Sequence, residues 1–192
     1  MKQKILLTIL GVFICGTTWA QGGRYTTKYD EYFRKYSKHY FSVAFDWRWF
    51  KAQAIAESDL RETVVSWCKA KGIMQLLPST FEELVKKYPE LQNDIHDPRW
   101  NIAAGIRYDR ELWNSWRAER PFEDRLSFTF GSYNAGFGTL LRAQDVCKKK
   151  GLNENYWQSI EKVAPEVPKW RHEETLGYVK KIKKFVDEVT PR

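Results

Sequence analysis

The stretch that decides the fold is Gly72-Ile73-Met74-Gln75-Leu76-Leu77-Pro78. Glu57-Ser58 precedes it, and the short run Tyr133-Asn134-Ala135-Gly136 follows it. In the central stretch the glycine allows the backbone to approach a ligand, the proline ends the turn, and the glutamine carries a side-chain amide. Together the three segments supply one carboxylic acid, an amide and an aromatic hydroxyl. Such a set can hold a sugar chain and protonate a glycosidic oxygen.

Glu57 is the candidate catalytic acid. The sequence predicts a helix from Trp47 to about Glu57 with Asp46 as its cap. Glu57 then lies at the negative end of the helix dipole, and apolar surroundings would disfavour its charged form further. We therefore expect a raised pKa and a protonated acid near neutral pH. A glutamate chosen blindly is usually a surface residue, and the two other motifs at suitable spacing favour the catalytic interpretation.

The polar residues of the three motifs are candidate substrate-binding groups: Ser58, Gln75, Tyr133 and Asn134. The Ser58 hydroxyl could bond near the acid or the substrate, or it could cap a turn. Gln75 suits an N-acetyl or hydroxyl group of a sugar, and Tyr133 could bond either the acid or a sugar. Asn134 could also brace its turn, in which Gly136 is expected to supply an unusual φ angle.

The sequence predicts helices along almost its whole length, so the expected fold class is all-α. The expected helices span residues 26–40, 47–57, 78–88, 102–116, 122–132, 138–149, 155–163 and 172–189. Asp97-Pro98 predicts a turn, and Asn101 predicts the cap of the helix that follows. Thr63 to Trp67 has strand-like composition, which leaves room for a short β-ribbon between Asp59 and Gly72.

The first twenty residues predict a secretory signal peptide. Two lysines open the chain, an apolar run too short to span a bilayer follows, and Thr18-Trp19-Ala20 offers a cleavage site. A lipoprotein signal ending at Cys15 is the alternative, but Ile14 stands where a small residue is needed. We expect an exported chain, periplasmic or secreted after cleavage near Ala20, with no stable membrane insertion. The expected organisation is a signal peptide (1–20), an N-terminal helical extension (21–45) and one main domain (46–192).

The expected mature chain is basic. Beyond residue 20 it has 30 basic and 24 acidic residues, a net charge of +6. Basic proteins are attracted to nucleic acid, anionic lipid or an anionic cell wall, and export argues against nucleic acid. The lysines at 148–150 and at 180, 181, 183 and 184 are interpreted as solvated helix faces.

The two cysteines beyond the signal peptide, Cys68 and Cys147, form a possible disulfide that would tie two sides of the proposed binding cleft together. The chain has no CxxC motif, and His39, His96 and His172 lack the spacing of metal ligands. The sequence therefore shows no metal-binding pattern.

In order and rough spacing, the three motifs resemble the catalytic (SLT) domain of soluble lytic transglycosylases, lysozyme-like enzymes that cut bacterial peptidoglycan. The resemblance runs from about Trp47 to about Phe185. It implies a lysozyme-like fold, peptidoglycan glycan strands as substrate and no cofactor. It also implies that Glu57 is the single acid/base, which protonates the bond between N-acetylmuramic acid and N-acetylglucosamine and yields a 1,6-anhydro product. A late family motif matches Glu174-Thr175 followed by Tyr178, which makes Tyr178 a candidate active-site hydroxyl.

The chain departs from the family pattern at several positions. Lys69 stands where the family usually has glycine, and Asp59-Leu60-Arg61 replaces the usual aromatic and glycine positions. Leu77 stands where many members have methionine. These departures concern substrate binding more than the reaction.

Three other interpretations stay open. If Asp59 positioned a water, the enzyme would be a hydrolytic muramidase on the same fold. A non-catalytic glycan-binding module would bind without turnover, and a membrane-active cationic protein would lyse cells independently of Glu57. Residues 26–40 could also contact an unknown partner protein of the cell envelope, or simply pack on the domain.

Overall fold

The computed structural model describes residues 24–92 and 94–189, so the predicted signal peptide lies outside the described residues. The described chain is helical, as expected. Its elements are α1 (Asp30–Tyr40), α2 (Arg48–Ser58), α3 (Pro78–Lys87), α4 (Pro98–Ser115), α5 (Phe122–Ala135), α6 (Phe137–Lys149), α7 (Trp157–Val163), the 3-10 turn η1 (Ala164–Glu166) and α8 (His172–Val189).

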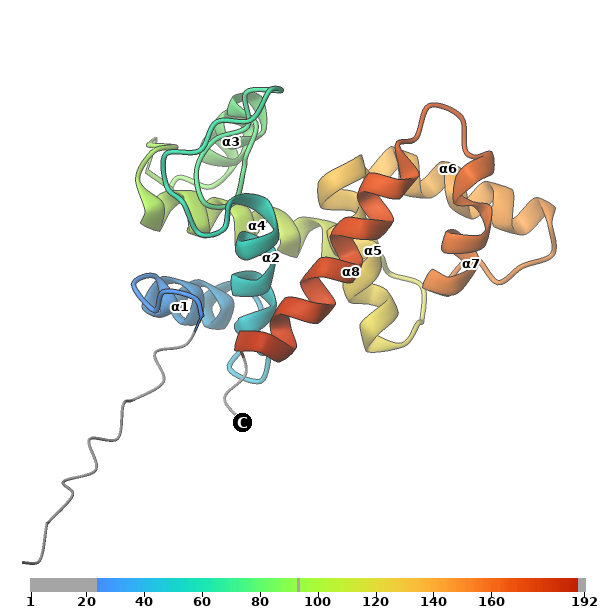
Figure 1. Ribbon diagram of the computed structural model, residues 1–192, viewed down its shortest axis with the longest axis horizontal. Coiled ribbons are helices and arrows are strands. Elements are labelled where there is room, and N and C mark those ends of the chain that lie inside the picture. Colours follow the sequence, from blue (N-terminus) through green and yellow to red (C-terminus); the bar gives the residue numbers. More distant parts are fainter. Residues whose placement is uncertain (1–23, 93, 190–192) are drawn as a thin grey trace, which may run out of the picture.

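The two helices α2 and α8 pack along one another in the middle of the molecule. In Figure 1, α1, α3 and α4 lie on one side of this pair, and α6 and α7 lie on the other. Each side has its own hydrophobic cluster, and α2 contributes Phe50 to the first and Ala52 to the second. Phe45 and Phe185 pack against both clusters. The C-terminal end of α2, which carries Glu57, therefore lies where the two halves of the core meet.

Helix α1, within the predicted N-terminal extension, contributes to this core. Helix α1 packs on α4 and α2, and the side chain of Phe33 is completely buried. Lys51 Nζ of α2 lies 2.6 Å from Asp30 Oδ1 of α1, and both side chains are largely withdrawn from solvent. A buried charge requires a partner of this kind, so the pair fixes α1 to α2.

Helix α1 begins at Asp30 rather than at Thr26. Two helix boundaries near the motifs also differ from the predictions. Helix α4 begins at Pro98 rather than near Ile102, because Asp97 Oδ1 accepts the Arg99 N–H at 2.7 Å and proline fits the first helical position. The predicted cap, Asn101, therefore lies inside the helix, where it is 1% exposed. At the other boundary, α5 continues to Ala135, so the third motif ends a helix instead of forming a separate turn. The N-cap position of α2 is Trp47 rather than the predicted Asp46, although Asp46 Oδ1 accepts the Arg48 N–H at 3.0 Å.

The long loop between α2 and α3 contains little β-structure. Among the described residues, the ribbon left open by the sequence is reduced to isolated antiparallel bridges between Val65 and Lys71 and between Lys71 and Leu76. Backbone N–H groups of this loop bond to carbonyls within it, including Gly72 N to Val64 O at 3.1 Å. The loop is therefore a set of linked turns, whose side-chain supports are described below.

The possible disulfide is not formed, and both cysteines are free thiols. Cys147 is fully buried in the second cluster on α6, whereas Cys68 is exposed on the loop between α2 and α3. Packing of Cys147 into the core leaves its sulfur facing apolar groups instead of the other cysteine.

The surface of the described helices is polar. The lysines at 148–150, 180, 181 and 184 are exposed, as the sequence predicted for solvated faces. Within residues 24–92 and 94–189, no helix has both the length and the apolar character that a membrane span requires.

Candidate active site

Glu57 and Tyr178 meet where α2 and α8 pack together. Tyr178 Oη donates a hydrogen bond to Glu57 Oε1 at 2.5 Å, and Tyr178 is only 7% exposed. Glu57 itself is half-buried in the last turn of α2, which ends where Asp59 takes the left-handed conformation with φ 55°. The predicted acid and the tyrosine of the late motif are thus brought into direct contact.

The environment of Glu57 favours its neutral form. Burial raises the pKa of Glu57 to about 8; the hydrogen bond from Tyr178 opposes this shift, and the nearby charge of Glu174 adds to it. Near neutral pH most Glu57 side chains therefore carry a proton, which a general acid requires. Burial, with a contribution from the Glu57 charge, also raises the pKa of Tyr178 well above its ordinary value, so this hydroxyl remains a donor.

Side chains from three helices hold the turn of the central motif in place. Ser58 Oγ of α2 donates to Ile73 O at 2.8 Å, and Tyr133 Oη of α5 donates to Met74 O at 2.8 Å. Asn101 of α4 accepts the Met74 N–H on its Oδ1 at 2.8 Å and donates from Nδ2 to Lys71 O at 3.0 Å. All three motifs of the sequence therefore converge on this one turn.

The turn itself needs the glycine that the sequence singled out. Gly72 has φ +75°, and a Cβ atom there would lie 2.4 Å from Asn101 Nδ2, far inside contact distance. Gln75 also has a positive φ, 46°, and its Nε2 donates to Val64 O at 3.0 Å and to Gly72 O at 2.8 Å. Both N–H groups of the Gln75 amide are thus engaged within the loop, which leaves its Oε1 as the group to offer a ligand.

The other predicted substrate-binding residues differ in their exposure to solvent and in the groups that they contact. Ser58 is 3% exposed and faces the loop backbone, so in this structure it supports the turn instead of facing solvent. Tyr133 is half-buried against Met74. Asn134 is exposed, and its Oδ1 accepts from Thr175 Oγ1 of α8 at 2.8 Å. Of the two residues predicted to shape turns, Pro78 is the first residue of α3. Gly136, with φ +83°, joins α5 to α6.

Sequence reasoning missed three features of this region. Asn101 was interpreted as a cap, although a buried asparagine in an apolar stripe is a signal for a backbone-binding role. Asp109 of α4 and Gln53 of α2 are both completely buried, and the hydrogen bond between them joins residues 56 positions apart, which local sequence patterns do not show. Trp67 is 85% exposed on the loop between α2 and α3, with Arg171 Cζ 5.9 Å from its ring centroid.

Neither Asp59, which the sequence left open as a residue that positions a water, nor Asp46 is among the groups that shift the pKa of Glu57. Asp59 is exposed, and its charge acts on Tyr25 of the N-terminal segment. Asp46 is ion-paired with Arg48 at the far end of α2, roughly 16 Å along the helix from Glu57. Glu174 lies close enough to affect Glu57, and it forms an ion pair with Arg171 at 3.0 Å.

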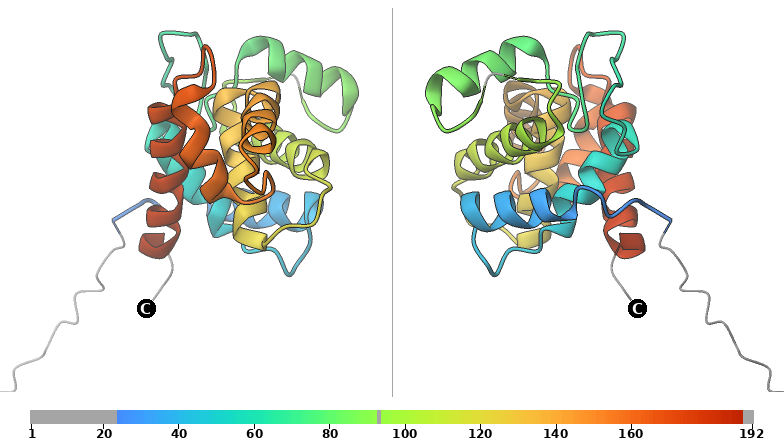
Figure 2. Two further views of the ribbon diagram at one scale, coloured as in Figure 1. Left: turned by 90° about the vertical axis from the view of Figure 1, so that its right-hand side faces the viewer. Right: turned by 90° about the vertical axis from the view of Figure 1, so that its left-hand side faces the viewer.

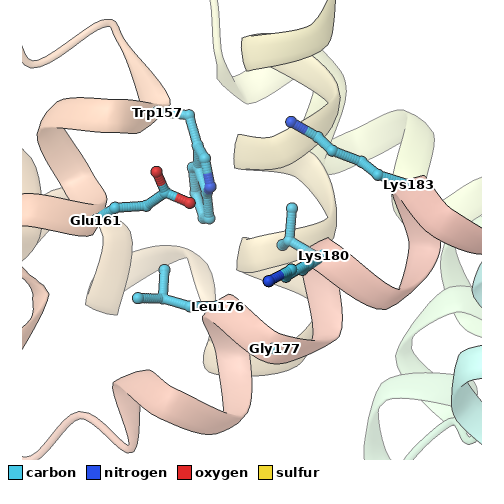
Figure 3. Close-up of a pocket in the computed structure, with 7 residues that line it drawn as sticks. Trp157, Glu161, Leu176, Gly177, Lys180 and Lys183 are labelled. Atoms are coloured by element: carbon cyan, nitrogen blue, oxygen red, sulfur yellow. The ribbon is translucent and has the colours of Figure 1, made fainter.

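A separate hollow of about 250 Å³ lies between α7 and α8. Figure 3 shows Trp157, Glu161, Lys180 and Lys183 around it, and Tyr178 is not among the residues that line it. None of the three motifs contributes to this hollow. Among residues 24–92 and 94–189, no group of three or more His, Cys, Asp or Glu side chains gathers as a metal site would.

Solved structures of lytic transglycosylases share this helical, lysozyme-like fold. The crystal structure of the 70 kDa soluble lytic transglycosylase from Escherichia coli matches with a TM-score of 0.65 and 23% identity, over 86% of this chain and 24% of that chain. An inactive mutant of the lytic transglycosylase Slt from Pseudomonas aeruginosa matches with a TM-score of 0.57 and 17% identity, over 88% and 26% of the two chains.

The family follows from the sequence comparison. The model of the transglycosylase SLT domain matches residues 31–156, so this chain belongs to the SLT domain family. A protein named membrane-bound lytic murein transglycosylase F from Desulfosudis oleivorans is 34% identical over 63% of this chain and 25% of its own length. One of the same name from Pseudomonas fluorescens is 27% identical over 90% and 34%. The chain thus spans between a quarter and about a third of these relatives.

Proposed function

We propose that this protein is a peptidoglycan lytic transglycosylase with Glu57 as its single general acid/base. Its substrate would be the β-1,4 bond between N-acetylmuramic acid and N-acetylglucosamine, and its product a 1,6-anhydro-N-acetylmuramic acid end. The observation that carries this proposal is the Glu57–Tyr178 contact: a half-buried carboxyl with a pKa of about 8, bonded to a buried hydroxyl. Membership of the SLT family and the relatives named lytic murein transglycosylases support the substrate class.

The reaction needs one carboxyl group acting twice. Protonated Glu57 donates its proton to the glycosidic oxygen as the C1–O bond of the muramic acid breaks. The Glu57 carboxylate then accepts the proton of the muramic C6 hydroxyl, whose oxygen bonds to C1. Glu57 ends protonated and no water is consumed. The hydrogen bond from Tyr178 stabilises the carboxylate that exists between the two transfers.

The remaining groups would hold the glycan. Gln75 Oε1 and Asn134 Nδ2 have no partner among the described residues, so an acceptor and a donor are left for sugar groups. Ser58, Asn101 and Tyr133 would act by fixing the turn that carries Gln75. The predicted export of the chain would place the enzyme in the periplasm or outside the cell, where peptidoglycan lies.

Mass spectrometry of the products released from purified sacculi tests the proposal. Residues 21–192, which include every described helix, are compared with the Glu57→Gln variant and with Glu161→Gln, an exposed glutamate at the α7–α8 hollow. Anhydromuropeptides from the wild type and Glu161→Gln, but not from Glu57→Gln, would support it. Reducing-end products, heavier by one water, would identify a hydrolytic muramidase. Binding to sacculi without products from any variant would indicate a glycan-binding module.

A further inference from the structure

A second acid is completely buried beside the active site. Asp109 of α4 is 0% exposed, and its Oδ1 accepts one long hydrogen bond, 3.3 Å, from Gln53 Nε2 of α2. Asp109 Oδ2 and Gln53 Oε1 are both buried and have no hydrogen-bond partner. Within the described part of the chain Asp109 forms no ion pair, in contrast with the buried carboxylate of Asp30, which is paired with Lys51. The proposed mechanism uses neither Asp109 nor Gln53.

A single proton on the Asp109 carboxyl would allow the two unpartnered atoms, Asp109 Oδ2 and Gln53 Oε1, to form a hydrogen bond with each other. An ionised carboxylate in this position would be a buried charge with one weak neutral donor, an arrangement that proteins avoid. A protonated carboxyl instead carries one O–H donor and one acceptor oxygen. Its acceptor oxygen matches the Gln53 N–H that is already in place, and its O–H matches the unpartnered Gln53 carbonyl. An acid and an amide then satisfy one another through two reciprocal hydrogen bonds.

We propose that Asp109 is held as the neutral acid in a reciprocal pair with Gln53, and that this pair positions Glu57 without placing a second negative charge beside it. Gln53 lies one helical turn before Glu57 on the same helix. Asp109 lies two turns after Asn101, which holds the Met74 turn. The pair therefore links the helix that carries the acid to the helix that supports the substrate-facing loop. The positioning role rests on the proposed function of Glu57, whereas the protonation of Asp109 does not.

The surroundings of Asp109 are consistent with a neutral group. Burial raises the pKa of Asp109 well above its ordinary value, and the charge of Glu57 raises it further. The other titratable groups with which it interacts are Tyr133 of α5, Tyr178 of α8 and Tyr108 of its own helix, which are neutral near pH 7. Although α1 and α3 also pack on α4, no charged group of theirs in the described chain is among its electrostatic partners. Glu57, with a pKa of about 8, thus loses its proton beside a neutral neighbour.

Carboxyl 13C NMR of the full protein labelled at aspartate tests the protonation directly. The Asp109→Asn variant identifies the Asp109 resonance by its loss. We expect that resonance at the shift of a protonated carboxyl, with no titration between about pH 4 and pH 8, where ordinary aspartates are ionised. A carboxylate shift at neutral pH would overturn the proposal. The readout does not depend on turnover, so it can fail or succeed independently of the transglycosylase assignment.

Labelling at glutamate tests the link to Glu57. Asparagine can replace the acid in the pair, because its N–H can donate to Gln53 Oε1 and its carbonyl can accept from Gln53 Nε2. If Asp109 is neutral, Asp109→Asn leaves the midpoint of the Glu57 titration unchanged. If Asp109 is ionised, Asp109→Asn removes a negative charge beside Glu57 and increases the acid dissociation constant of Glu57 at least tenfold. That result would contradict the proposal.

A leucine at position 109 tests the positioning role, because leucine cannot bond to the Gln53 amide and leaves it unpaired. We expect Asp109→Leu to lower kcat on glycan strands at least tenfold with little change in KM, and Asp109→Asn to restore most of kcat. Equal kcat for Asp109→Leu and the wild type would refute the positioning role. If Asp109→Leu does not fold, the double variant Gln53→Leu/Asp109→Leu, which has no unpaired polar group, takes its place with the same expected loss of kcat.

Discussion

Tyr178 Oη donates a hydrogen bond to Glu57 Oε1 at 2.5 Å, although 121 positions separate the two residues in the chain. The contact exists because α8 packs along α2, the helix that ends at Glu57. Burial opposes ionisation of the glutamate, while the tyrosine stabilises the ionised form. Glu57 is thereby balanced between the two protonation states that an acid/base must visit.

Removal of the Tyr178 hydroxyl should shift the pH dependence of activity. The bond lowers the pKa of Glu57, so Tyr178→Phe raises that pKa above its value of about 8. Activity of the wild type should fall as pH rises through about 8, because Glu57 loses its proton. In Tyr178→Phe the fall should move to higher pH, with kcat lowered roughly tenfold because the intermediate carboxylate loses a donor. A pH profile of kcat/KM measures both effects, and an unmoved basic limb would contradict this prediction.

Glu57 should also make the stability of the folded protein depend on pH. Its pKa is about 8 when folded and near 4.5 when unfolded, so between these values the folded state binds the extra proton. The free energy of unfolding should therefore fall as pH rises through this window, by at most about 1.4 kcal/mol per unit. Glu57→Gln lacks this term, so its stability relative to the wild type should increase from pH 5 to pH 8. Urea unfolding at several pH values measures the difference, which a constant gap would disprove.

Asn101 should contribute strongly to stability and activity. Replacement by alanine removes the acceptor of the Met74 N–H in a buried bond, and the donor to Lys71 O and Ile95 O in two part-buried bonds. We expect Asn101→Ala to reduce the free energy of unfolding by about 3 kcal/mol and to lower kcat/KM, because the turn loses its anchor. Asn114→Ala, at an exposed position of the same helix, is the matched control and should change neither. Denaturant unfolding distinguishes the two variants.

Lys69 occupies a backbone conformation that suits glycine. Its φ is +67°, in the left-handed region that glycine adopts without a Cβ penalty. Lys69→Gly should raise the free energy of unfolding by about 1 kcal/mol, or a few degrees in Tm. Lys69→Ala keeps a Cβ atom and should show no such gain. Thermal unfolding of the pair checks this, and equal Tm values would mean that the loop carries no strain at this residue.

Trp67 should contact the glycan strand. Its ring is 85% exposed and lies against Arg171, which immediately precedes α8. In both views of Figure 2 the loop after α2 and the loop before α8 rise side by side. Since exposed tryptophan faces suit sugar rings, Trp67→Ala should raise KM for glycan strands roughly tenfold without changing stability. Trp67→Phe should recover part of the loss. An unchanged KM in Trp67→Ala would exclude this contact.

Much of the fold was predictable because helix signals are local. The spacing of apolar residues and the caps predicted the expected helices, and α8 was predicted with its bounds, His172–Val189. Predictions failed where two local signals competed. Asp97 and Asn101 are both good caps, and packing of the Asn101 side chain against the Met74 turn decided in favour of Asp97. The cysteine pair failed as a disulfide because burial of Cys147 cannot be read from its spacing to Cys68.

The sequence by itself predicted the class of helical domain, the candidate acid Glu57 and the turn from Gly72 to Pro78, because residue type and local spacing carry these properties. The tertiary structure alone decided which side chains support that turn and which of them face a ligand. It also paired Asp109 with Gln53 and brought Tyr178 to Glu57. These relationships depend on which faces of α2, α4 and α8 are packed together, and such long-range packing follows from the burial of the whole core.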